Sequence, residues 1–131
     1  MFNWLNYIYL AKVLIERKDE ASLRSAISRL YYGFFGIVRR YLINVKNKYY
    51  LREYNRDVHS NVYDELRLSK DPTEKQIAKI LNKLRLIRNN ADYDADEEYD
   101  LNFFKDFINR NSKDLIIAFG AVKYLKQHPN Y

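Results

Sequence analysis

Apolar residues recur along most of this chain at intervals of three and four positions, and no segment alternates with the period of two that a half-buried strand shows. The chain holds only three glycines and two prolines, so few positions interrupt this spacing. It predicts amphipathic helices over residues 3–18, 20–44, 58–69, 72–92 and 99–126. We therefore expect an all-α fold, in which residues 1–131 form a single-domain bundle of four to five helices.

The segment 20–44 carries the longest apolar stripe and is expected to form the central helix. Its stripe consists of Leu23, Ala26, Ile27, Leu30, Phe34, Ile37 and Tyr41. Its other sides carry Tyr31, Tyr32 and Phe35, which indicates contacts on more than one face. Gly33 and Gly36 also lie in it, although glycine costs a helix about 1 kcal/mol relative to alanine. These two glycines predict a close approach of a neighbouring backbone, or a distortion.

The segment 72–92 has the clearest start signal in the chain. Asp71 is a favourable N-cap, Pro72 suits the first helical position, and Glu74 occupies the third. The apolar stripe that follows consists of Ile77, Ile80, Leu81, Leu84, Ile87 and Ala91. At about 100° per residue, Arg88 falls inside this stripe.

A guanidinium on an apolar stripe needs a partner, because burying an unpaired charge is costly. Asp92, one helical turn beyond Arg88, is the expected partner, and Arg85 lies on the same flank of the helix. Two interpretations remain open. Arg88 either forms a structural ion pair at the helix end or belongs to a site that handles phosphate.

The connector at 45–56 is basic and rich in tyrosine, and it shows no convincing period. Its tyrosines and basic residues interleave, as Lys46, Lys48, Tyr49, Tyr50, Arg52, Tyr54 and Arg56. Charge for phosphates and rings for bases are what single-stranded nucleic acid requires. A plain solvated loop is the alternative.

Two features of the last segment modify the predicted helix at 99–126. Its middle, 109–112, is polar, so we expect a kink or an interruption there. The four residues after it, 128–131, are expected to fray. They include His128, to which we assign no role.

Charge and composition narrow the function classes. The net charge of +6 lies in the first sixty residues, which contain eleven Lys and Arg but only five Asp and Glu. This basic half either contacts phosphate groups or is a solvated basic surface. The absence of cysteine excludes disulfides, thiolate zinc sites and a cysteine nucleophile. No signal peptide or membrane span is evident, so a soluble, cytoplasmic protein that avoids membranes is expected.

We predict neither a metal site nor a cofactor. Asp92, Asp94 and Asp96 match the first three ligands of an EF-hand calcium loop. The match then fails, because Glu97 stands where glycine is required and Phe103 where the final glutamate is required.

Three segments together carry a family pattern. Residues 26–35 read Ala-Ile-Ser-Arg-Leu-Tyr-Tyr-Gly-Phe-Phe, Ser60 follows His59, and residues 85–93 read Arg-Leu-Ile-Arg-Asn-Asn-Ala-Asp-Tyr. Over roughly residues 5–125 this pattern resembles the HEPN domain, in particular the small stand-alone members that often accompany minimal nucleotidyltransferases. The resemblance implies a helical bundle, commonly a homodimer, with roles in RNA cleavage, toxin–antitoxin systems and nucleotide binding.

Ribonucleases of the HEPN family use an Arg-x4–6-His motif with a polar residue, often Asn, after the Arg, and the motifs of two protomers meet at the dimer interface. By this resemblance Arg88 and Asn89 match the first two positions, and Tyr93 stands where the histidine is expected. RNA cleavage needs groups that exchange protons near neutral pH. A tyrosine with its usual pKa of about 10 is a poor general base.

The expected function is therefore RNA or nucleotide binding, of the toxin–antitoxin or defence type, with a degenerate ribonuclease motif made of Arg88, Asn89 and Tyr93. Arg85, Arg88 and His59 are the candidate phosphate-binding residues. One alternative is a non-catalytic interaction subunit that partners a nucleotidyltransferase. A second is an active, metal-independent endoribonuclease that uses His59 or Tyr93.

Overall fold

The computed structural model describes residues 1–131 and contains six α-helices, one short 3-10 helix and no strand. The helices are α1 Leu5–Glu16, α2 Glu20–Asn44, η1 Tyr49–Arg52, α3 Val58–Arg67, α4 Pro72–Tyr93, α5 Leu101–Arg110 and α6 Ser112–Lys126. The prediction of an all-α single domain is confirmed. The predicted number of four to five helices is wrong, because the last predicted helix is two helices.

The helix is interrupted between α5 and α6 at Asn111, whose φ and ψ angles of −106° and 8° are not helical. The Asn111 side-chain amide donates to the carbonyl of Phe107 at 2.9 Å, and the Ser112 hydroxyl donates to the carbonyl of Asn109 at 3.1 Å. Such local side-chain bonds compete with helical ones. The interruption is confined to Asn111, because its N–H still donates to the carbonyl of Phe107 at 3.1 Å and its carbonyl accepts from the N–H of Leu115 at 2.9 Å.

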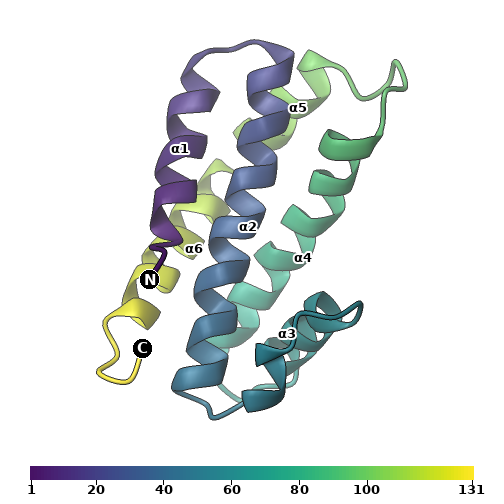
Figure 1. Ribbon diagram of the computed structural model, residues 1–131. Coiled ribbons are helices and arrows are strands. Elements are labelled where there is room, and N and C mark those ends of the chain that lie inside the picture. The colour runs from purple at the N-terminus through teal and green to yellow at the C-terminus, as the bar shows by residue number, and fades with distance from the viewer.

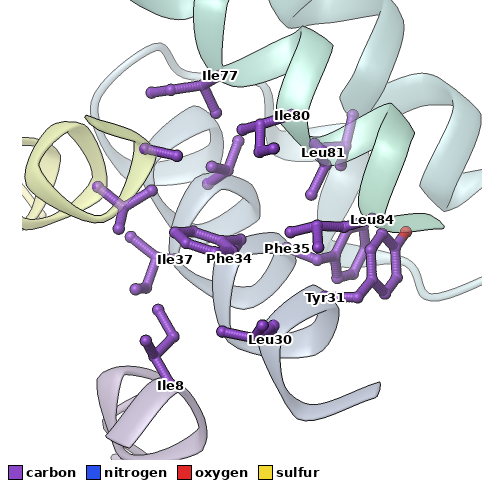
Figure 2. Packing of buried hydrophobic residues seen from close by; sticks show 14 of the residues in the cluster. Ile8, Leu30, Tyr31, Phe34, Phe35, Ile37, Ile77, Ile80, Leu81 and Leu84 are labelled. Carbon is purple, nitrogen blue, oxygen red and sulfur yellow. The ribbon is translucent and has the colours of Figure 1, made fainter. Parts of the chain in front are cut away.

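Helix α2 is the centre of the bundle, and it contacts each of the other α-helices. In Figure 1 it runs through the middle of the molecule, with α1 on one side and α4 on the other. Close up, Ile8 of α1 faces Ile37 of α2, while Phe34 and Leu84 meet between α2 and α4 (Figure 2). No helix combines the length and apolar character that crossing a bilayer requires.

Gly33 and Gly36 lie where α1 crosses α2. A Cβ atom added at Gly36 would lie 2.1 Å from Cδ2 of Trp4, and one added at Gly33 would lie 2.6 Å from Cγ1 of Ile8. Both values are shorter than any van der Waals contact. The close approach predicted from these two glycines is confirmed, because α1 packs directly on the bare backbone of α2.

Helix α4 begins as its sequence predicts. The Asp71 carboxylate accepts a hydrogen bond from the backbone N–H of Thr73 at 2.8 Å, and Pro72 is the first helical residue. Glu74 is buried, and its carboxylate lies 3.4 Å from Nζ of Lys46. Glu74 therefore ties the start of α4 to the chain that follows α2.

The end of the chain is packed, so the prediction of a frayed tail is wrong for Tyr131. Its carbonyl oxygen accepts hydrogen bonds from Nε of Arg40 at 2.9 Å and from the amide of Asn44 at 3.0 Å. The Arg40 guanidinium carbon lies 4.4 Å from the centroid of the Tyr131 ring. Two polar side chains near the end of α2 thus fix this tail.

Candidate functional site

Arg88 is buried in the α4 stripe, with a side chain only 9 % exposed. Its Nη1 lies 3.6 Å from the Asp92 carboxylate and donates to the Tyr32 hydroxyl at 3.2 Å. The same Asp92 oxygen accepts a hydrogen bond from the Ser28 hydroxyl at 3.3 Å. The predicted pairing of Arg88 with Asp92 is confirmed, and Nε of Arg88 remains buried without a hydrogen-bond partner.

The Arg88 guanidinium also lies against two aromatic rings of α2. Its central carbon is 5.1 Å from the centroid of the Tyr31 ring and 5.3 Å from that of Tyr32. Such cation–π contacts are worth about 0.5–2 kcal/mol, more when the cation is removed from water. The rings of Tyr31 and Tyr32, which lie off the main apolar stripe of α2, therefore pack against the buried guanidinium and stabilise its charge.

His59 of α3 lies on the same group of rings. Its Nδ1 is 2.5 Å from the Tyr31 hydroxyl oxygen, and its Nε2 is 2.7 Å from the Tyr54 hydroxyl oxygen. The imidazole stacks on Phe35 with ring centroids 4.4 Å apart. A neutral imidazole has one donor and one acceptor nitrogen, so one tyrosine donates to His59 and the other accepts.

Burial, and after it the nearby charges of Arg85, Arg88 and Arg39, together lower the pKa of His59 to about 4. His59 is therefore neutral at pH 7. Burial also raises the pKa of Tyr31, against the opposing effect of Arg85 and Arg88. Three guanidinium groups thus act on a neutral imidazole.

The structure brings together Arg85, Arg88 and His59, but it places Asn89 and Tyr93 elsewhere. Asn89 is exposed, and Tyr93 is 75 % exposed. Tyr93 lines a separate hollow of about 490 Å³, together with Arg24 and the acidic loop that follows α4. At about 100° per residue, positions 89 and 93 lie about 100° and 140° around the helix from Arg88. They therefore face away from its guanidinium.

Arg24 of α2 holds the end of α4 in place, and the sequence pattern did not single it out. Its Nη1 donates to the carbonyls of Asn90, Ala91 and Asp94 at 3.2, 3.0 and 2.7 Å, and its Nη2 donates to the carbonyl of Tyr99 at 2.6 Å. Carbonyls at the end of a helix have no partner within the helix. Arg24 supplies that partner, and it thereby positions the turn that carries Arg88 and Asp92.

Three further residues of the site were not among the predicted site residues. Tyr31, Tyr32 and Tyr54 bind His59 or Arg88 through their hydroxyl groups. The position of Tyr31 and Tyr32 off the apolar stripe was the only signal in the sequence. No group of three His, Asp or Glu side chains that could hold a metal ion is present.

The pKa of His59 predicts how stability depends on pH. The unfolded chain binds a proton near pH 6.5, whereas the folded protein binds it near pH 4. The contribution of His59 to stability is therefore fully present above pH 6.5 and is lost as the pH drops towards 4. Because His59 is half-buried, we expect a loss on the order of 1 kcal/mol from this group.

Urea denaturation of the wild type and of His59→Gln at neutral pH and near pH 5 measures this loss. The wild type should lose more stability than the variant on acidification. An equal loss in the two proteins would show that another group titrates.

Comparison of the chain with protein-family models, with curated proteins and with solved structures finds no match. Two features point to a function: the contacts of Arg88 and His59 beside the charge of Arg85, and the resemblance carried by residues 26–35 and 85–93.

Proposed function

We propose that this protein is a HEPN-like RNA- or nucleotide-binding protein of the toxin–antitoxin or defence type, and that it holds a phosphate group with Arg85 and Arg88 beside His59. The observation that carries the proposal is Arg85. This half-buried guanidinium takes part in no ion pair, yet its charge acts on His59. A cation without a counter-ion, next to a second cation, favours an anionic ligand.

Phosphate suits this group better than a single carboxylate does. A guanidinium presents several N–H donors in one plane, and a phosphate accepts from several directions. Arg88 has its Nη1 committed to Asp92 and Tyr32, so Arg85 is the group that meets an incoming phosphate first. Arg88 then adds charge from below the surface.

The neutral protonation state of His59 at pH 7 favours a binding role over a catalytic one. A general acid or base works best with a pKa near the working pH. His59, with a pKa of about 4, holds no proton to give at pH 7 and accepts one only weakly. Tyr93, the residue in the position of the family's histidine, does not contact Arg88. A metal-independent endoribonuclease is therefore the weaker candidate.

The second candidate is a non-catalytic interaction subunit that partners a nucleotidyltransferase, or a homodimer with no ligand in this site. The contacts of Arg88 with Asp92 and Tyr32 are those of a structural residue as well. Exposed apolar side chains support a protein partner, with Val13 of α1 63 % exposed and Ile116 of α6 73 % exposed. In this case Arg85 is dispensable.

The test is the affinity for dye-labelled RNA and for AMP, measured by fluorescence anisotropy and by calorimetry. Arg85→Ala should weaken binding roughly 10-fold to 150-fold, because one charge-assisted hydrogen bond contributes about 1.5–3 kcal/mol. The wild-type affinity for RNA should fall as salt rises. Arg17→Ala, which removes an equal charge from a side chain 67 % exposed at the end of α1, is the matched control and should bind normally.

Unchanged binding in Arg85→Ala, with an unchanged melting temperature, would contradict the proposed site. A wild type that binds neither RNA nor AMP would favour the interaction subunit. Cleavage of the labelled RNA by the wild type, lost in His59→Ala or Tyr93→Phe, would establish the ribonuclease instead.

A further inference from the structure

The connector between α2 and α3 is an ordered part of the molecule. Its central residue, Leu51, is 1 % exposed and belongs to the core. Arg39 of α2 donates from Nε to the carbonyl of Leu51 and from Nη2 to the carbonyl of Arg52, both at 2.8 Å. One buried side chain and one bidentate guanidinium thus hold the 3-10 turn η1 against α2.

Three tyrosine rings stand on this ordered connector with much of their surface in solvent. Tyr49, Tyr50 and Tyr54 are 54 %, 52 % and 58 % exposed. Each hydroxyl is nevertheless bonded: that of Tyr49 donates to the Asn47 amide at 2.9 Å, and that of Tyr50 donates to the Glu65 carboxylate at 2.6 Å. The hydroxyl of Tyr54 bonds His59, as described above. The rings are therefore exposed but restrained in orientation.

Exposed aromatic rings that are already restrained bind a ligand with little loss of conformational entropy. An apolar ring face gains free energy when another ring covers it. A side chain that is already fixed loses little conformational entropy on binding. The faces of these three rings are thus suited to stack on planar groups.

Positive charge lies beside these rings. The Arg52 guanidinium carbon lies 4.8 Å from the centroid of the Tyr49 ring, and that of Arg39 lies 5.4 Å from the centroid of the Tyr54 ring. The other three basic side chains of the connector have acidic neighbours: Lys46 has Glu74 at 3.4 Å, Lys48 has Glu65 at 3.2 Å, and Arg56 has Asp57 at 3.6 Å. Arg52 therefore remains available for a phosphate.

Tyr54 links this surface to the site of Arg85 and Arg88. Its hydroxyl bonds Nε2 of His59, whose other nitrogen contacts Tyr31, the ring under Arg88. Tyr54 therefore joins the connector to the ring that lies against Arg88.

We propose that Tyr49, Tyr50 and Tyr54 form a base-stacking platform, so that the ligand is a single-stranded RNA of several nucleotides. This inference rests on the proposed function, because it extends the ligand from the phosphate site. Stacking on a protein ring requires an unpaired base, which a duplex does not present. Neither a mononucleotide nor a duplex uses the platform.

The test compares a short dye-labelled oligouridine, an RNA duplex of the same length, and AMP. We expect the wild type to bind the single strand most tightly. The double variant Tyr49→Ala/Tyr50→Ala should lose roughly 5-fold to 100-fold in affinity for the single strand, the range found for one stacked base. Its affinity for AMP should not change. A 4-thiouridine probe should photo-crosslink to the connector.

Two further variants serve as controls. Tyr50→Phe removes the bond to Glu65 but keeps the ring, so it should bind the single strand almost as the wild type does. Tyr124→Ala removes a ring that is 70 % exposed on α6, away from the connector, and it should bind normally. The melting temperature of each variant confirms that it is folded.

The outcomes separate this inference from the proposed function. If Arg85→Ala weakens binding and Tyr49→Ala/Tyr50→Ala does not, the platform is wrong and the phosphate site stands. If the tyrosine variants alone weaken binding, the platform stands and the phosphate site is wrong. Equal affinity for the single strand and the duplex overturns the platform. A wild type that binds no RNA overturns both.

Discussion

Replacing Arg24 with alanine should lower the free energy of unfolding by about 3 kcal/mol, the largest loss we expect from any single polar side chain here. Arg24 satisfies four backbone carbonyls between Asn90 and Tyr99. Its guanidinium carbon also lies 4.7 Å from the centroid of the Phe104 ring. Alanine removes this donor from the carbonyls of Ala91, Asp94 and Tyr99, whereas the carbonyl of Asn90 still accepts from the backbone N–H of Asp94 at 3.1 Å. It also removes the contacts of this side chain with the end of α4 and the start of α5.

Urea and thermal denaturation measure this loss, which corresponds to a melting temperature lower by roughly 10 °C for a domain of this size. Arg24→Lys keeps the charge but presents a single nitrogen, so it should recover less than half of the loss. Arg17→Ala is the control for removing a positive charge near the start of α2, and it should change stability by less than about 0.5 kcal/mol. Equal effects of Arg24→Ala and Arg17→Ala would contradict the capping role.

Gly36→Ala should destabilise the protein by about 2 kcal/mol, although alanine is the better helix former by about 1 kcal/mol. The added Cβ would lie between 2.1 and 2.6 Å from three carbon atoms of the Trp4 ring. The rigid indole must therefore leave its place, and the packing of α1 on α2 is lost with it.

The matched control is Gly120→Ala in α6, where an added Cβ meets no atom within 4 Å. There only the helix propensity acts, and stability should rise by about 0.5–1 kcal/mol. Opposite signs for the two alanines, measured by urea denaturation, are the expected result. Stabilisation by both would show that Trp4 does not depend on the bare backbone of Gly36.

Local patterns predicted most of the helices. The bounds of α2, 20–44, are confirmed, since Asp19 caps its first turn and its apolar stripe is unbroken. The start of α4 is confirmed for the same kind of reason. The break at Asn111 was expected only as a kink or an interruption, because whether an amide displaces a helical bond depends on the packing of both halves.

The site was predictable only as far as its contacts are local. Arg88 and Asp92 are one turn apart, so spacing alone predicts their pair. His59 meets Tyr31, a residue 28 positions earlier, and Arg24 meets carbonyls at least 66 positions later. Such contacts follow from how α2, α3 and α4 pack. The Arg-x4–6-His pattern also placed Tyr93 in one site with Arg88, although the two residues point to different sides of α4.

The bonds of His59 have a consequence for how this sequence can evolve. Tyr31 and Tyr54 each bond one of its nitrogens, and Phe35 covers its face. Loss of Tyr31 or of His59 leaves a part-buried polar atom of the other without its partner, which costs about 1–3 kcal/mol, whereas water can replace the exposed bond of Tyr54. Replacement of Tyr31 and His59 together is therefore less damaging than replacement of either one alone. In diverging descendants of this chain, Tyr31 and His59 should be inherited together or replaced together.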